Sequence, residues 1–322
     1  MKPSIQPSLW IPPAPPRTKV RKLRASLQRI ALPALGEDVA IDAQGRLICG
    51  LVDGRIVRLH NGAVELLATT GGRPLGIEVD GSIAIVCDAK RGLLRLDMES
   101  KQLSVLVDAR EHGLGFCNNA ALARDGTIYF SDSSQQVGID HWRGELLAHS
   151  GTGRLLKRTP DGDVSVLIEG LEFANGVALA ADESFVAIAE TTAYRVRKLW
   201  LKGPLAGSQD ALIQDLPGFP DNMSRDEQGR LWIALASPRN ALLDFLLPLP
   251  GLIRQVVWAL PERVQPNPTR SIHVIAVDDD GAVVRELGGK TRAFHMVTGM
   301  RVHGDKLYLA SLAEAALAVV TL

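Results

Sequence analysis

The sequence lacks most of the features that identify a membrane protein or a nucleic-acid-binding protein. No apolar stretch reaches the roughly 18 uninterrupted residues of a membrane-spanning helix, so we expect no transmembrane segment. Lys and Arg together number 36, and so do Asp and Glu. This formal neutrality argues against a nucleic-acid partner, because such a surface needs an excess of basic residues.

Cysteine is scarce, with only Cys49, Cys87 and Cys117 in the chain. Their spacing matches no zinc or redox motif. The proline-rich beginning has no apolar run of the kind found in secretory signals. An odd number of cysteines without such a signal fits a reducing compartment, so we expect a cytoplasmic protein.

Helical patterns are also scarce, which argues against a doubly wound α/β fold. The 322 residues, 46% of them hydrophobic and 22% charged, suffice for a soluble globular protein with a large core. Residues 1–30 differ from the rest, because five prolines between Pro7 and Pro16 precede a basic run from Arg17 to Arg29. We expect an N-terminal arm with little to bury, whose first 16 residues could be deleted with almost no loss of stability.

The remaining chain repeats one hairpin pattern, in which a polar side chain precedes a turn by eight residues. Asp221 precedes Gly229 in this way, and a β-rich strand follows the turn. The same spacing recurs in three more places: from Glu37 to Gly45, from Asn118 to Gly126, and from Asn175 to Glu183. Four hairpins therefore begin with an oxygen-bearing side chain in one register. Two related hairpins, at residues 76–81 and 300–308, lack that side chain.

The hairpins group into units of about forty residues with four short strands each, which is typical of propeller blades. Six units can be counted, with inner strands that begin near Glu37, Pro74, Asn118, Asn175, Asp221 and Val297. The pattern predicts an all-β fold, a six-bladed β-propeller over residues 31–322.

Residues 241–264 interrupt this rhythm. The segment is long and apolar, and Pro248, Pro250 and Pro261 divide it. We expect one or two short helices inserted into blade five. Such an insertion could simply pack on top of the propeller, or it could serve as a substrate lid, a dimer contact or a membrane-surface contact.

The shared register predicts a metal site. Inner strands of a propeller line its central channel, so equivalent positions form a ring around it. This ring would contain Glu37, Asn118, Asn175 and Asp221, with Asn222 beside Asp221. Hard oxygen donors without Cys or His suit Ca²⁺ better than Zn²⁺, although another divalent cation could be bound. Alternatively, the amides only satisfy backbone groups at strand starts.

Several motifs resemble those of the strictosidine-synthase-like proteins, across about residues 30–322. They are Phe173-Ala174-Asn175-Gly176-Val177, Pro220-Asp221-Asn222, residues 72–77 and residues 129–134. The likeness is greatest to the branch that contains adipocyte plasma membrane-associated protein, and paraoxonases and the regucalcin/gluconolactonase group are more distant relatives. This resemblance implies a six-bladed propeller with a metal at the centre of its channel. It also implies the calcium ligands Glu37, Asn118, Asn175, Asp221 and Asn222.

The chain departs from these relatives at three positions. Thr298 stands where strictosidine synthase has its catalytic glutamate, so that condensation is not expected. Leu75 replaces a histidine of the paraoxonases, and Asn119 replaces an aspartate that usually follows the blade-three asparagine. The change to Leu75 removes a proposed base, and the change to Asn119 removes a carboxylate near the metal.

We therefore expect a metal-dependent hydrolase that acts on a small molecule, a lactone or another ester, with Asp221 as the candidate base. Two alternatives stay open. One is a lyase, isomerase or condensing enzyme at the same site, and the other is a non-catalytic propeller with a structural metal and a binding surface at the insertion of residues 241–264. Candidate substrate contacts are Leu75, Asn119, His141, Trp142, Phe219, His295 and Thr298. For the two histidines and the two aromatic residues, ordinary packing is the alternative interpretation.

Overall fold

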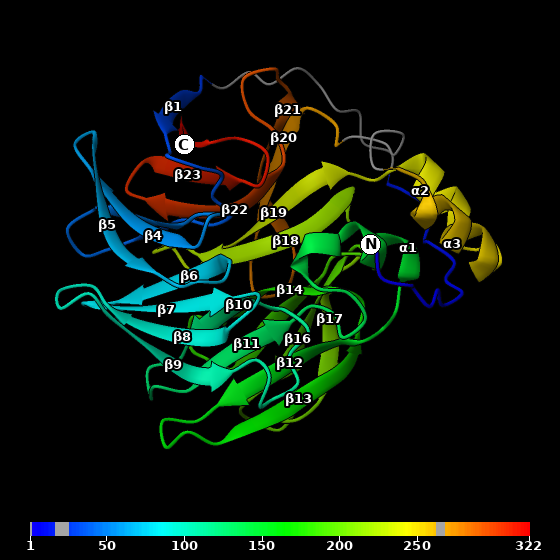
Figure 1. Ribbon diagram of the computed structural model, residues 1–322, viewed down its shortest axis with the longest axis horizontal. Coiled ribbons are helices and arrows are strands. Elements are labelled where there is room, and N and C mark those ends of the chain that lie inside the picture. The colour runs from blue at the N-terminus through cyan, green and yellow to red at the C-terminus, as the bar shows by residue number, and fades with distance from the viewer. Residues whose placement is uncertain (1, 17–25, 262–267) are drawn as a thin grey trace.

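The strands form six sheets of four strands each in the computed structural model, which describes residues 2–16, 26–261 and 268–322. Blade one contains β2 (Ala40–Ile41), β3 (Leu47–Gly50), β4 (Arg55–His60) and β5 (Ala63–Thr69). Blade two contains β6 (Pro74–Asp80), β7 (Ile83–Asp88), β8 (Gly92–Asp97) and β9 (Gln102–Asp108). Blade three contains β10 (Cys117–Leu122), β11 (Ile128–Asp132), β12 (Gly153–Arg158) and β13 (Val164–Leu171). Blade four contains β14 (Ala174–Leu179), β15 (Phe185–Glu190), β16 (Arg195–Trp200) and β17 (Gln209–Ile213). Blade five contains β18 (Gly218–Arg225), β19 (Leu231–Pro238), β20 (Ser271–Val277) and β21 (Val283–Lys290). Blade six contains β22 (Val297–His303), β23 (Lys306–Ser311), β24 (Ala316–Thr321) and β1 (Gln28–Ala31). The expected six-bladed β-propeller is thus confirmed (Figure 1).

The two ends of the chain close the ring of blades. β1 pairs antiparallel with β24, with Gln28 opposite Val319 and Ala31 opposite Ala316. An isolated bridge between Gly36 and Ser311 then links blade six to the start of blade one. The first and last strands lie side by side in Figure 1. β1 also spans residue 30, so the expected boundary between arm and propeller falls within a strand.

The repeated turns have the geometry that their register predicts. The residue eight positions after each polar side chain has a positive φ, at Gly45 (73°), Gly126 (86°), Glu183 (59°) and Gly229 (78°). Glycine adopts this left-handed conformation without a steric penalty, whereas Glu183 must tolerate it. The sequence repeat is therefore a repeat of backbone conformation.

The inner strands carry a second repeated feature, a β-bulge. The pairing of inner and second strand shifts between Cys117 and Ala120 in blade three, and the same shift occurs at the equivalent position of blades two, four and five. A bulge bends a strand and re-aims its side chains. Here it falls on Asn118, Asn175 and Asp221, so the bulges place these side chains at the channel.

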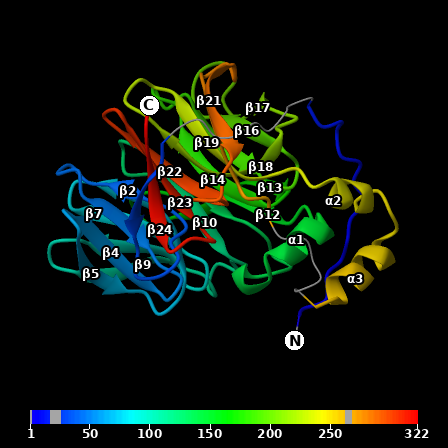
Figure 2. The ribbon, with the colours of Figure 1, turned by 90° about the horizontal axis from the view of Figure 1, so that it is seen from above.

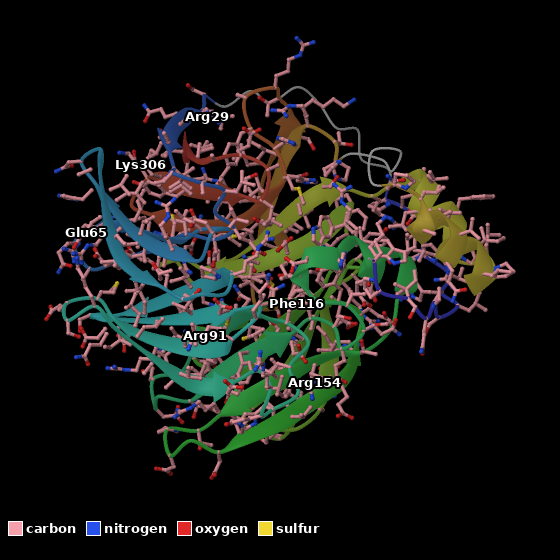
Figure 3. The ribbon with its side chains drawn as sticks, viewed as in Figure 1. Arg29, Glu65, Arg91, Phe116, Arg154 and Lys306 are labelled. Atoms are coloured by element: carbon pink, nitrogen blue, oxygen red, sulfur yellow. The ribbon has the colours of Figure 1, made fainter. Side chains whose placement is uncertain are left out.

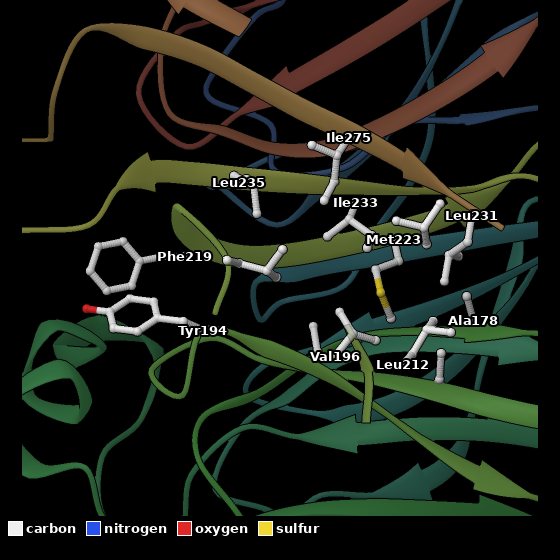
Figure 4. Packing of buried hydrophobic residues seen from close by; sticks show 14 of the residues in the cluster. Ala178, Tyr194, Val196, Leu212, Phe219, Met223, Leu231, Ile233, Leu235 and Ile275 are labelled. Atoms are coloured by element: carbon white, nitrogen blue, oxygen red, sulfur yellow. The ribbon is translucent and has the colours of Figure 1, made fainter. Parts of the chain in front are cut away.

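Apolar side chains fill the space between neighbouring blades. Figure 4 shows one such layer, in which Met223, Ile233 and Ile275 of blade five face Val196 and Ala178 of blade four. Each fully buried side chain of this size contributes roughly 1.5–3 kcal/mol. The blades are therefore held in a fixed relation around the channel.

The helices gather on one side of the propeller (Figures 1 and 2). They are the 3₁₀ helix η1 (Ile139–His141), α1 (Arg143–Ala148), α2 (Ala241–Leu246) and α3 (Gly251–Ala259). Asn240 caps α2, since its side chain accepts hydrogen bonds from the N–H groups of Leu242 and Leu243. α2 and α3 lie between β19 and β20 of blade five, as expected for residues 241–264, of which 262–264 lie outside the described residues. In the described ranges no helix is long and apolar enough to cross a membrane.

The expectation that residues 1–16 bury little is wrong. Ile5 is only 1% exposed and belongs to the core cluster that includes Trp258. The arm is also tied by its carbonyl groups, because Trp258 Nε1 donates to Pro3 at 2.8 Å and an Arg254 guanidinium nitrogen donates to Ser8 at 2.8 Å. Composition gave no sign of this, since one isoleucine and several backbone carbonyls make the attachment. Most of the basic run, residues 17–25, lies outside the described residues.

Candidate functional site

Four side chains from four different blades line one central cavity. Glu37 stands just before β2, Asn118 lies on β10, Asn175 on β14 and Asp221 on β18. We call these four the ring residues. All are buried, with exposed fractions between 2% and 7%. Residues far apart in the sequence thus line one cavity, while their role as metal ligands stays a prediction.

Hydroxyl groups orient the two amides of the ring. Asn118 Nδ2 donates to Ser133 Oγ at 2.9 Å, and that hydroxyl donates to the carbonyl of Ala174, the residue before Asn175. Asn175 Nδ2 in turn donates to Thr191 Oγ1 at 3.1 Å, and that hydroxyl donates to the carbonyl of Pro220, the residue before Asp221. Each amide nitrogen is thereby used on the protein side. The amide oxygens are left for another partner.

Three oxygens at the site have no partner, which is the observation that tests a metal. Glu37 Oε2, Asn118 Oδ1 and Asn175 Oδ1 are buried without a hydrogen-bond partner among the described residues. Both polar atoms of the Asn222 side chain are also buried and unpartnered there, although Asn222 is not among the residues that line the cavity. Buried polar groups are normally satisfied. In the described part of the chain no three His, Cys, Asp or Glu side chains form a metal-binding group, so a cation here would depend on the amide oxygens. Carboxylate and amide oxygens together fit a hard cation such as Ca²⁺.

The electrostatics of the site point the same way. Burial, and then the neighbouring Asp221 carboxylate, raise the pKa of Glu37 well above its ordinary value. Burial also raises the pKa of Asp221 to about 8. Hydrogen bonds from the backbone N–H of Asn222 and from the side chain of Asn175 act in the opposite direction and lower this pKa. Two buried carboxyl groups that resist ionisation would both be favoured in their charged form by a cation between them. A cation bound at this site would therefore lower the pKa of both carboxyl groups.

The positions that follow the ring residues alternate between polar residues and glycine. Blades one, three and five carry Asp38, Asn119 and Asn222, whereas blades two, four and six carry glycines. A Cβ on Gly176 would lie 2.5 Å from the carbonyl oxygen of Asp221, so only glycine allows this close approach. Asn119 Oδ1 accepts a hydrogen bond from the N–H of Val177 at 2.9 Å, which bridges blades three and four. Its role is thus to join blades, and it does not line the cavity.

Apolar side chains form the walls of the cavity. Phe116 and Phe173 pack edge to face with ring centroids 5.7 Å apart, and Phe116 lies towards the middle of the propeller in Figure 3. Helices α1 and α2 add further wall residues: Arg143, Leu146, Leu147, Leu242, Leu243 and Leu246. The cavity of about 190 Å³ therefore combines an apolar wall with a polar floor, which is typical of small-molecule sites.

The other predicted substrate contacts divide into two groups. Trp142 and Phe219 line the cavity, and His295 lines an adjoining cavity, where its Nδ1 lies 2.6 Å from Glu314. His141 does not line either cavity and packs edge to face on Trp258, at 6.2 Å between ring centroids.

Leu75 and Thr298 occupy the ring position in blades two and six. Both are fully buried, and neither lines the cavity. Thr298 Oγ1 donates to the carbonyl of Glu37 at 2.7 Å, so it positions a ring residue. Sequence reasoning missed the role of Ser133 and Thr191. Each is a hydroxyl residue that directly follows the acidic residue at the end of the second strand of its blade, β11 or β15.

The strictosidine synthase family model matches residues 118–204, and the N-terminal model of the strictosidine synthase-like proteins matches residues 25–59. Adipocyte plasma membrane-associated protein of Rattus norvegicus is 32% identical over 329 residues, which cover 92% of this chain and 85% of that protein. The chain belongs to the strictosidine synthase-like family. A plant relative, strictosidine synthase-like 6 of Arabidopsis thaliana, is 32% identical over 288 residues, which cover 86% of this chain and 76% of that protein.

Solved structures with the same fold are more distant in sequence from this strictosidine synthase-like chain. A gluconolactonase from Xanthomonas campestris matches with a TM-score of 0.65 and 18% identity over 96% of both chains. Regucalcin of Agrobacterium tumefaciens, described as a calcium-binding protein, matches with a TM-score of 0.64 and 14% identity over 94% of this chain and 95% of that one. At these identities the likeness is one of fold.

Proposed function

We propose that this strictosidine synthase-like protein is a metal-dependent hydrolase that acts on a lactone or another ester at the ring residues, with Ca²⁺ as the preferred cation. One observation carries the proposal: buried, unpartnered oxygens of Glu37, Asn118 and Asn175 face a cavity beside Asp221. Asn222, with its unpartnered amide, would complete the ligand set. The names of the gluconolactonase and of the calcium-binding regucalcin that share the fold agree with this chemistry.

When bound, a hard divalent cation would polarise an ester carbonyl and stabilise the negative charge that develops on its oxygen. The chain itself supplies three further functions. Asp221 lines the cavity and is the candidate group that accepts a proton from water. The hydroxyls of Ser133 and Thr191 hold the two amides in one orientation, and the apolar walls exclude bulk water from the reacting bond.

A condensation of the strictosidine synthase type has less support. The residue at the expected catalytic position, Thr298, is fully buried, and its hydroxyl is committed to a backbone carbonyl. A hydroxyl in this state offers neither an acid nor a free nucleophile to a substrate.

Turnover of a lactone panel tests the proposal directly. Aliphatic γ- and δ-lactones and phenyl esters should be hydrolysed by the purified protein, and EDTA should lower the rate by about 10²-fold or more because the cation's charge stabilisation is lost. Added Ca²⁺ should restore the rate. Hydrolysis that is unaffected by EDTA would exclude the metal-dependent mechanism, and no turnover of any substrate would argue for a structural metal.

Calcium should also stabilise the fold. At a free concentration of about 100 times Kd, ligand binding adds roughly 2.7 kcal/mol, and we expect the Tm to rise by about 5 °C or more. Glu37→Gln should lose most of this rise, because one of two ring carboxylates is removed. Glu99→Gln is the control, since Glu99 is exposed in the turn between β8 and β9. An equal calcium-dependent rise in both variants would place the cation elsewhere.

A further inference from the structure

A second cavity adjoins the one above the ring residues. It has a volume of about 470 Å³ and shares Trp142, Arg143, Pro268, Met296 and Leu312 with the first. Its remaining lining residues differ in character, because they include the basic side chains Arg73, Arg270 and His295. The first cavity therefore has mostly apolar walls, and the second, which adjoins it, has a cationic lining.

Two of the basic groups in the second cavity share one acidic partner, Glu314, which also pairs with Arg29. Arg270 forms an ion pair with Glu314 at 2.9 Å, and His295 Nδ1 lies 2.6 Å from the same carboxylate. The other acidic side chain near this face, Asp140, pairs with Lys90 at 2.9 Å, and the more distant charge of Arg73 also helps to lower its pKa. Both carboxylates thus have a direct ion-pair partner other than Arg73 and Arg143.

Arg73 and Arg143 are left without an ion pair among the described residues. The Arg143 guanidinium lies only over the Trp142 ring, 5.6 Å from its centroid, and both arginines are partly buried. Arg73 also lies close enough to the ring that its charge opposes the rise in the Glu37 pKa caused by burial and by Asp221. Partly buried guanidinium groups bind carboxylates and phosphates well, because the fork of N–H donors matches these anions.

The apolar part suits a long hydrocarbon group. Phe116, Phe173 and Phe219 line it from the blades, and Leu242, Leu243 and Leu246 line it from α2. A neutral apolar molecule would leave the two guanidinium groups without a partner, and a small hydrophilic anion would leave the apolar wall in contact with water. An amphiphilic anion satisfies both parts of the space.

We propose that Arg73 and Arg143 form a subsite that binds the anionic group, a carboxylate or a phosphate, of an amphiphilic substrate whose hydrocarbon chain lies along α2. The assignment of that molecule as substrate rests on the proposed function, and in that case it is an ester or lactone with a long apolar part and an anionic group. The binding itself does not depend on hydrolysis.

Binding of three matched probes tests the subsite. Decanoate, decyl phosphate and decan-1-ol share one hydrocarbon chain and differ in the head group. Affinities are measured by isothermal titration calorimetry in EDTA, so that no metal can bind the head group. The proteins are the wild type, Arg143→Gln, Arg73→Gln and the control Arg285→Gln, because Arg285 is exposed on the outer strand β21. Tm values of all four show whether each variant is folded.

At least one of the two anions should bind about 10-fold more tightly than decanol, and added salt should reduce that difference. The tighter anion identifies the head group. Arg143→Gln and Arg73→Gln should each weaken anion binding by about 10-fold and change decanol binding by less than about 2-fold, whereas Arg285→Gln should change neither. If Arg73→Gln does not fold, Arg143→Gln decides alone, because no hydrogen bond or ion pair joins Arg143 to a ring residue in the described part of the chain.

The inference is overturned if anions and alcohol bind equally, if both arginine variants lose anion and alcohol binding alike, or if no probe binds. Its failure can be told from failure of the proposed function. Arginine-dependent binding of decanoate without any lactone turnover would reject hydrolysis and keep the subsite. Calcium-dependent turnover without preference for the anions would do the reverse.

Discussion

Asp221→Asn should lower lactone or ester turnover by about 10²-fold or more, even at saturating Ca²⁺. The substitution is nearly isosteric, and an asparagine oxygen can still accept the 3.0 Å hydrogen bond that Asp221 Oδ1 receives from the N–H of Asn222. The fold and the ring amides should therefore survive. What is lost is one of two carboxylates at the cavity and the candidate base.

The same substitution should weaken calcium binding substantially, because ligand charge is a main determinant of calcium affinity. In EDTA the variant should be as stable as the wild type, since it removes a carboxyl group whose ionisation is opposed by burial. If the metal is only structural, the variant should have a lower Tm in Ca²⁺, and excess Ca²⁺ should restore it by mass action.

Turnover, calcium affinity and Tm are measured for the wild type, Asp221→Asn and the control Asp80→Asn across a calcium titration. Asp80 is exposed at the far end of the inner strand β6, so its variant should behave as the wild type. Wild-type turnover by Asp221→Asn at saturating metal would rule out Asp221 as the base. Unchanged calcium affinity would go further and reject the ring residues as the metal site.

A truncation that lacks residues 1–16 should lose considerable stability. Ile5 is 1% exposed, and filling its place with a smaller side chain should cost roughly 2–5 kcal/mol. The truncation would also leave Arg254 without one partner. This arginine is 1% exposed, and its described partners are the carbonyl groups of Leu147, Ala148 and Ser8. The loss of one hydrogen-bond partner by a buried guanidinium adds a further penalty.

Two point variants test whether the arm stabilises the protein through the buried side chain of Ile5 and not simply through the presence of 16 more residues. Ile5→Ala should lower the free energy of unfolding by roughly 2–5 kcal/mol, whereas Leu9→Ala should change it by less than about 0.5 kcal/mol, because Leu9 is 71% exposed. Chemical denaturation of the wild type, the truncation and both variants provides the values. A truncation as stable as the wild type would show that the arm does not stabilise the protein in solution.

The arm also bears on the cavity. It binds α3 through Trp258, Arg254 and Gln255, and α3 contributes Val257 to the cavity wall. Residues 1–16, which the sequence predicted to be dispensable, thus hold in place a helix that contributes to the cavity wall. The cytoplasmic location, and a dimer or membrane contact through residues 241–264, stay predictions.

The sequence by itself determined the repeat. Alternating apolar residues and turns define six similar units, and four of them carry a polar oxygen-bearing side chain at one register. Such local patterns can be read because they recur within each hairpin. The ring residues follow from that register, since equivalent positions in a closed propeller must meet at its channel. The spacing alone therefore predicts that Glu37, Asn118, Asn175 and Asp221 lie together.

Only the tertiary structure decided which side chains surround the ring. Ser133 and Thr191 orient the amides across blade boundaries, Arg73 and Arg143 come from different blades to one cavity, and the arm docks through carbonyl groups that every residue possesses. Conversely, three residues that the sequence predicted as substrate contacts have other partners. His141 packs on Trp258, Leu75 belongs to a buried apolar cluster, and Thr298 donates to the carbonyl of Glu37. These contacts join segments that are far apart in the chain, and their geometry depends on bulges and helix placement that leave no periodic signal in the sequence.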